Sequence, residues 1–176
     1  NSPRGEGAAP SFVLLSHGGG DMVKLSDLLS DSDAVVVGLF QTSSPNAERQ
    51  HKDFEGAAIM IDADIAFVQI ATGENVQSVD LDTYSLSLNE SWPLLMDESD
   101  ASVGNSFPSG ATDAVIVIDA AGFITSWQPG TMSALEIEEA ASSASKGSGN
   151  NPLALFSIII STAVLPLLVL AMPRNR

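Results

Sequence analysis

The sequence predicts an α/β sandwich, in which helices flank a central mixed β-sheet, followed by one C-terminal transmembrane helix. Short apolar runs of strand length alternate with amphipathic stretches of helix length. The apolar run 34–40 and the β-branched run 115–118 are typical of strands buried on both faces. The charge-free run 153–172 has the 20 residues that a helix needs to cross a bilayer.

The first elements form a small N-terminal unit. A strand is expected at 11–15, followed by the turn His17-Gly-Gly-Gly-Asp21 and a second short strand at 22–25. Ser26 is expected to cap a short helix at 27–30, because a serine at this position can accept a helix N–H.

The remaining elements continue the pattern. Strand 34–40 leads through Pro45, which suits a first helical turn, into a helix at 46–60. The expected elements after it are a strand at 65–70, a helix at 75–86, strands at 92–96, 115–119 and 123–127, and a helix at 132–144. The order βαβ, then a β-hairpin, then a helix predicts a mixed sheet.

Composition excludes several classes of function. The chain has 22 acidic against 7 basic side chains and a net charge of −15, which argues against nucleic-acid binding. It has no cysteine, which excludes a disulfide scaffold, a cysteine zinc site, a thiolate iron–sulfur cluster and dithiol chemistry. The acidity indicates either an ordinary solvated surface or adaptation to high salt.

The C-terminal part of the sequence predicts that the protein is anchored in a membrane. We expect an N-terminal tail at 1–10, a domain at 11–141, a flexible linker at 142–151, a transmembrane helix at 152–172 and a basic tail at 173–176. Arg174 and Arg176 favour a cytoplasmic C-terminus and an extracytoplasmic domain. The chain begins at Asn1, so it is either a mature form or a fragment. Without a signal sequence, the helix would instead be a tail anchor with the domain inside.

Four motifs occur in the order found in one family. They are Phe12, Leu14, Gly20, Val23, Leu25, Ser26, Asp27 and Leu28, then FQTSSPNA at 40–47, WPLLMD at 92–97 and IVIDAAGFI at 116–124. Over residues 11–145 the chain resembles the redoxin branch of the thioredoxin-like fold, the thiol-disulfide oxidoreductases and peroxiredoxin relatives. The resemblance implies a thioredoxin-like sandwich.

The departures from this family concern its active site. Ser44 stands at the position of the nucleophilic cysteine, Ala47 at that of the resolving cysteine, and Asp113 at that of the cis-proline. A serine hydroxyl cannot replace a thiolate in disulfide exchange or in peroxide reduction. The resemblance therefore implies the fold without the usual activity.

Other constellations are weaker. The loop His17-Gly-Gly-Gly resembles the oxyanion loop of lipases, but the chain lacks their G-x-S-x-G elbow, so a hairpin turn is favoured. A hydrolase built on Ser44 and His51 is disfavoured, because they are separated by more than a helical turn and no third member is evident.

Metal and cofactor sites are not expected. The carboxylate pairs Asp62/Asp64 and Asp80/Asp82 and the cluster Asp97, Glu98 and Asp100 lack EF-hand spacing and indicate solvated loops. Two histidines, His17 and His51, are too few for a zinc site. Asn89-Glu-Ser is a glycosylation sequon, usable if the domain lies outside.

We expect a non-catalytic binding or assembly module for a peptide or protein partner, anchored in the lipid bilayer. Its contact surface, here called the Ser44 face, comprises Thr42, Ser43, Ser44, Pro45, Asn46, Thr112 and Asp113. The reason is that a helix N-terminus offers free N–H groups and a positive dipole end there. A redox enzyme by family descent and a purely structural spacer remain alternatives.

Overall fold

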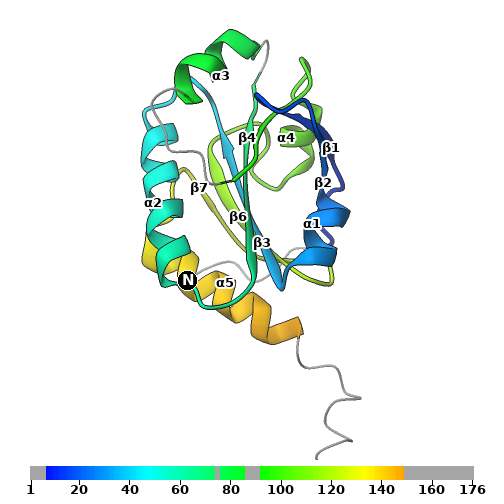
Figure 1. The fold of residues 1–176 in the computed structure, drawn as a ribbon, viewed down its shortest axis with the longest axis vertical. Helices are drawn as coiled ribbons and strands as arrows, with labels where there is room; N and C mark the ends of the chain where they lie inside the picture. The colour runs from blue at the N-terminus through cyan, green and yellow to red at the C-terminus, as the bar shows by residue number, and fades with distance from the viewer. Residues whose placement is uncertain (1–6, 74–75, 86–91, 149–176) are drawn as a thin grey trace, which may run out of the picture.

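The computed structural model describes residues 7–73, 76–85 and 92–148 (Figure 1). The elements are β1 (Val13–Ser16), β2 (Met22–Lys24), α1 (Leu25–Asp31), β3 (Ala34–Phe40), α2 (Asn46–Met60), β4 (Ile65–Ala71), α3 (Ser78–Ser85), β5 (Leu94–Met96), α4 (Ser102–Ser106), β6 (Ala114–Asp119), β7 (Ile124–Pro129) and α5 (Ala134–Ser148). The expected βαβ unit, hairpin and final helix are all present.

One mixed sheet organises these elements, with the strand order β2-β1-β5-β4-β3-β6-β7. The central strands β3 and β4 run parallel, with Ala34 opposite Ile65 and Phe40 opposite Ala71. Strand β6 is antiparallel to β3 and pairs Leu39 with Ala114. The parallel pair needs a crossover, and α2 supplies it.

Helices cover both faces of this sheet, and Figure 1 shows the sheet nearly edge-on between them. Helices α2 and α5 pack on one face, where Phe54 and Ile137 meet Val36 and Val117. Helices α1 and α4 pack on the other face. Alternate residues of a strand face opposite sides of the sheet, and helices cover both sides here. All of β3 is therefore buried.

Local features differ from three of our predictions. Helix α1 begins at Leu25, one residue before Ser26, so Ser26 lies within the first turn and makes no capping bond; that prediction was wrong. Helix α4 was missed, because five residues carry no readable periodicity. Helix α5 continues through Ser148, so residues 142–148 of the expected linker are helical.

The turn between β1 and β2 is a hairpin turn, as expected. The Ser16 N–H donates to the Asp21 carbonyl at 2.8 Å. Gly18 and Gly20 have positive φ angles of 76° and 72°, which side chains disfavour. The lipase-like interpretation of this loop has no support from its position, at the edge hairpin of the sheet.

Several predictions lie outside the described residues: the N-terminal tail up to residue 6, the sequon at Asn89, the end of the linker, the expected membrane helix and the basic tail. Among residues 7–73, 76–85 and 92–148, no helix is long and apolar enough to span a membrane.

Candidate functional site

Two loops from distant parts of the sequence meet at the carboxyl end of β3. Gln41 directly follows β3, and Asp113 directly precedes β6. The antiparallel pairing of Leu39 with Ala114 brings these two positions side by side. The register of the central strands therefore assembles the Ser44 face.

Asp113 joins the two loops. Its Oδ1 accepts the backbone N–H of Gln41 at 2.8 Å, and its Oδ2 accepts the Asn46 side-chain amide at 3.1 Å. The Ser44 hydroxyl donates a short hydrogen bond to the same Oδ2. The Gln41 side chain adds a bond from Nε2 to the carbonyl of Ala111 at 3.2 Å. Asp113 is thus a carboxylate with three donors, placed near the positive end of α2.

Ser44 also shapes the start of α2. Its Oγ accepts the Asn46 N–H at 3.2 Å, and its carbonyl accepts the Ala47 N–H at 3.2 Å. We expected free N–H groups at this helix start, but Ser44 already satisfies these two. The face is therefore closed by its own serine and aspartate, and less open to an outside anion than the sequence suggested.

The other predicted residues surround this cluster or lie beneath it. Ser43, Pro45 and Thr112 are exposed, and Thr42 is half-buried. Ala47 differs, because it is 2% exposed and packs against Phe40 and Tyr84 in the core. The structure therefore brings Ser44, Asn46 and Asp113 together, with exposed hydroxyl and proline surfaces beside them.

The cluster has no catalytic triad. His51 is buried, and its Nδ1 lies 2.9 Å from the Gln69 side-chain oxygen. Its other nitrogen lies 3.7 Å from a carboxylate oxygen of Glu55. The hydrogen-bond partner of Ser44 is a carboxylate, and a carboxylate is a poor base for an alcohol. Hydrolase chemistry at Ser44 has no support from this arrangement.

A buried polar network underlies the site, and the sequence analysis missed it. Gln50 donates from Nε2 to the carbonyls of Leu39 and Ala114, each at 3.1 Å. Gln69 donates to Gln50 at 3.2 Å. A Cβ on Gly38 would clash with the Gln50 side-chain oxygen, so the glycine makes room for that amide. A glycine inside a buried strand was the available signal.

The network continues to Trp92, whose indole N–H donates to the Gln69 oxygen at 3.0 Å. Because that oxygen accepts from Trp92 and faces His51 Nδ1, we assign the imidazole proton to Nδ1. His51 Nε2 is then a buried acceptor without a hydrogen-bond donor. The network fixes the orientation of α2 on the sheet.

Tyr84 lies beside Ala47 under the Ser44 face. Its hydroxyl donates to the Ala47 carbonyl at 3.0 Å, and its ring stacks on Phe40 with centroids 4.7 Å apart. Burial, which disfavours the phenolate, raises the pKa of Tyr84 to about 12, while Glu48 adds a smaller upward effect. The phenol therefore acts as a neutral donor.

The acidic cluster at 97–100 has a structural explanation. Asp97 is 4% exposed and accepts four hydrogen bonds, from the Thr72 hydroxyl and from three backbone N–H groups of residues 98, 103 and 104. It thereby ties the start of α4 to the end of β4. In the described part of the chain, no three His, Asp or Glu side chains converge as metal ligands.

No protein-family model and no curated protein sequence matches the chain. Solved structures do match. A thiol:disulfide interchange protein of the thioredoxin family from Chlorobium tepidum has a TM-score of 0.64 at 21% identity, over 82% of this chain and 99% of that one. An exposed lipoprotein thioredoxin from Streptococcus pneumoniae has a TM-score of 0.64 at 17% identity, over 76% of this chain and 99% of that one.

A third match is BsSco, a member of the Sco family of cytochrome c oxidase assembly proteins. Its TM-score is 0.65 at 13% identity, over 83% of this chain and 96% of that one. At these identities the likeness shows the fold alone. The chain therefore has the thioredoxin-like α/β fold of the thiol-disulfide oxidoreductases, and it has this fold without any cysteine.

Proposed function

We propose that this chain is a membrane-anchored thioredoxin-like module that binds or assembles a protein or peptide partner through the Ser44 face. The observation that carries the proposal is the Asp113 cluster: Ser44, at the position of the nucleophilic cysteine, and Asp113, at that of the cis-proline, hold two loops together. The serine cannot exchange disulfides. What remains is a fixed surface at the ends of central strands.

The chemistry of this surface suits an uncharged polar segment of a partner. Ser43 and Thr112 offer exposed hydroxyl groups, and Pro45 offers an exposed apolar ring. The Asp113 carboxylate already has three donors, so a ligand needs no cation to satisfy it. A peptide backbone, with its alternating donors and acceptors, fits such a surface.

The fold neighbours are compatible with an assembly role. BsSco belongs by its description to a family of cytochrome c oxidase assembly proteins. An assembly role for this chain is our extension of that similarity, and it rests on the absence of cysteines together with the closed Ser44 site.

The anchor is the charge-free run 153–172, and the arginines at 174 and 176 favour a cytoplasmic C-terminus. We expect the full chain to stay in the membrane fraction after extraction at alkaline pH. Protease added outside intact cells should digest the domain and leave the basic tail protected. Release by alkali, or protection of the domain, would contradict the anchor or its orientation.

The binding function is tested by crosslinking the full chain in native membranes and identifying the recovered proteins by mass spectrometry. Ser44→Trp and Asp113→Arg should abolish recovery of a partner. Ser43→Trp blocks the same face at an exposed residue and leaves the Asp113 hydrogen bonds intact. It therefore distinguishes loss of binding by a blocked surface from loss of binding by misfolding. Ser11→Trp, exposed on another part of the domain, is the matched control. Normal recovery of the partner with all three variants of the Ser44 face would refute the proposal.

The alternative is a redoxin that acts through cysteines of a partner, which the thioredoxin-like fold allows. The purified chain should reduce neither insulin disulfides nor hydrogen peroxide. Turnover in thiol-free preparations would favour that alternative. If face variants have no effect while changes in 153–172 do, the domain is a spacer.

A further inference from the structure

Among the described residues, no strand pairs with the first half of the outer edge of β4. Strand β5 pairs with β4 only from Gln69 to Ala71. The Asp64 carbonyl and the Thr72 N–H bond toward β3, whereas the Gln69 N–H and the Ala71 carbonyl bond toward β5. Since backbone groups alternate along a strand, the N–H and C=O groups of Ile65 and Phe67 point away from β3.

No group in the described part of the chain bonds to these outward-facing atoms of Ile65 and Phe67. Unpaired strand edges can add a further strand, so natural proteins usually cover or blunt them. Here the edge has neither a proline nor a lysine at 65–68. As far as the described residues show, this edge is open to pairing with an extended segment.

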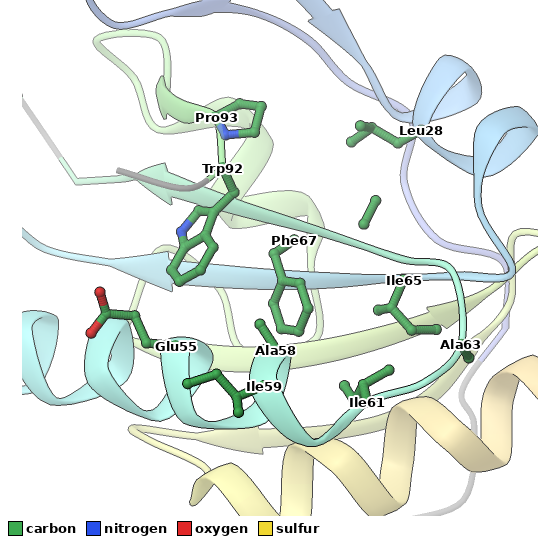
Figure 2. Close-up of a pocket in the computed structure, with 11 residues that line it drawn as sticks. Leu28, Glu55, Ala58, Ile59, Ile61, Ala63, Ile65, Phe67, Trp92 and Pro93 are labelled. Atoms are coloured by element: carbon green, nitrogen blue, oxygen red, sulfur yellow. The ribbon is translucent and has the colours of Figure 1, made fainter. Parts of the chain in front are cut away.

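An apolar groove of about 740 Å³ follows this edge. Figure 2 shows Phe67, Ile65 and Trp92 beside the last turns of α2, with Leu28 of α1 across the edge. The α2 wall is apolar and open to solvent: Ile59 is 86% exposed, and the neighbouring Met60 is 44% exposed. Helices of a soluble domain rarely leave such side chains uncovered next to a groove.

The charges at the groove are acidic. Glu55 lines it, and the exposed Asp62 and Asp64 flank the lining residue Ala63. Among the described residues, Glu55 forms no salt bridge with Lys52, and its carboxylate lies 3.7 Å from Nε2 of His51, the ring nitrogen without a proton. His51 Nε2 is buried and its ring lies against the Trp92 ring, so the part-exposed Glu55 carboxylate is the acceptor that a ligand in the groove can reach.

We propose that this groove binds an extended segment of a partner protein that adds to the free edge of β4, with apolar side chains against Ile59, Ile65 and Phe67 and a lysine or arginine at Glu55. The cation is argued from the acidic rim, which Glu55 forms together with the exposed Asp62 and Asp64. The extended shape is argued from the free backbone groups. A second copy is disfavoured, because the same acidic rim would meet itself.

This site is separate from the Ser44 face. The edge lies at the amino end of β4, level with Ala34, whereas Ser44 follows the carboxyl end of β3. Seven residues of strand separate the two, or roughly 20 Å. The proposal therefore goes beyond the proposed function, and either one can fail without the other.

The probe is the fluorescent peptide Ser-Val-Thr-Lys-Thr-Val-Thr-Val-Ser, which places its valines and lysine on one side. It is titrated by fluorescence anisotropy against the full chain in phosphatidylcholine nanodiscs. We expect saturable binding that weakens about tenfold when the peptide lysine is replaced by glutamate, and about fivefold in Glu55→Gln. Asp21→Asn, an exposed acidic residue at the β1–β2 turn, removes the same charge elsewhere and should leave binding unchanged.

Backbone pairing is tested with two N-methylated peptides, one modified at the valines and one at the threonines. One of the two peptides must lose binding, since only alternate amides of an added strand face β4. If the peptide methylated at the valines loses binding, the segment pairs antiparallel to β4. If the peptide methylated at the threonines loses binding, the segment pairs parallel to β4. Hydrogen exchange should slow at the Ile65 and Phe67 amides when the peptide binds. These readouts require no change to the protein fold.

Several outcomes would overturn the proposal. They are absence of binding, equal binding of both N-methylated peptides, or protection at residues 41–46 in place of 65 and 67. Protection at 65 and 67 without any peptide would show that another part of the chain or a second copy occupies the edge. Sedimentation of the full chain distinguishes a second copy, which makes a dimer, from another part of the same chain, which leaves a monomer. Either result contradicts the proposal that a partner protein occupies the edge.

Discussion

The Asp113 cluster makes a quantitative prediction about stability. Replacing Asp113 with alanine removes three hydrogen bonds, from the Gln41 N–H, the Ser44 hydroxyl and the Asn46 amide. Replacing Ser44 with alanine removes the bond to Asp113 and the bond that Ser44 accepts from the Asn46 N–H. The two changes share one interaction, so their effects on the free energy of unfolding should not add.

The magnitude follows from the number of bonds and their exposure. The side chains of Asp113, Ser44 and Asn46 are half-buried, so water can replace part of each lost interaction. At about 1 kcal/mol for each bond, Asp113→Ala should cost about 3 kcal/mol and Ser44→Ala about 2 kcal/mol. The double variant should be more stable than the sum of the single effects implies, by about 1 kcal/mol for the shared bond.

The assay is urea unfolding of the full chain in nanodiscs, followed by tryptophan fluorescence, for both single variants and the double variant. The matched control cycle pairs Asp113→Ala with Ser43→Ala, because the exposed Ser43 has no side-chain bond to Asp113. That cycle should be additive within about 0.5 kcal/mol. Additivity in the Ser44 cycle as well would refute the idea that Asp113 holds Ser44 in place.

Three further predictions follow. Tyr84 is the one tyrosine of the chain, and its phenol should titrate near pH 12 in the native protein and near pH 10 in urea, as read by tyrosinate absorbance. Because the native pKa is raised, the contribution of Tyr84 to the free energy of unfolding should be constant below pH 10 and fall between pH 10 and 12. A Ser44→Cys thiol should have a raised pKa beside Asp113, so iodoacetamide should modify it more slowly at pH 8 than in the Asp113→Ala background. Hydrogen bonds from Ser133 lower the pKa of Glu136. The stability that these bonds give the folded state is therefore present at neutral pH and is lost as the pH falls below 4.5. In thermal melts, Glu136→Gln should reduce this loss of stability at acid pH.

The central elements could be predicted from sequence because their signals are local and consistent. The continuous apolar run 34–40 and the amphipathic run 46–60 have the bounds of β3 and α2 in the structure. Elements fixed by tertiary contacts could not be predicted. Helix α4 depends on Asp97, whose carboxylate accepts the N–H groups of Val103 and Gly104, and nothing in those five residues alone indicates a helix.

The candidate site shows the same division. The alignment of motifs placed Ser44 and Asp113 at one site, and the structure brings them into contact. Their relationship could not be read from the sequence, because a carboxylate in place of the cis-proline has no family pattern to follow. The outcome reverses one expectation: Ser44 accepts the Asn46 and Ala47 N–H groups at the start of α2 that we expected to be free.

The position of α5 determines how the two proposed surfaces stand relative to the rest of the chain. Gly147 near its end and Asp119 of β6 line one pocket, and Asp119 is in register with Ala34, the residue opposite Ile65. The described chain therefore ends at the same end of the sheet as the β4 groove, and Figure 1 shows that end far from the start of α2. The β4 groove and the end of α5 thus share one end of the domain, and the Ser44 face lies at the other end. Because the two surfaces lie at opposite ends of the domain, occupation of one does not block the other.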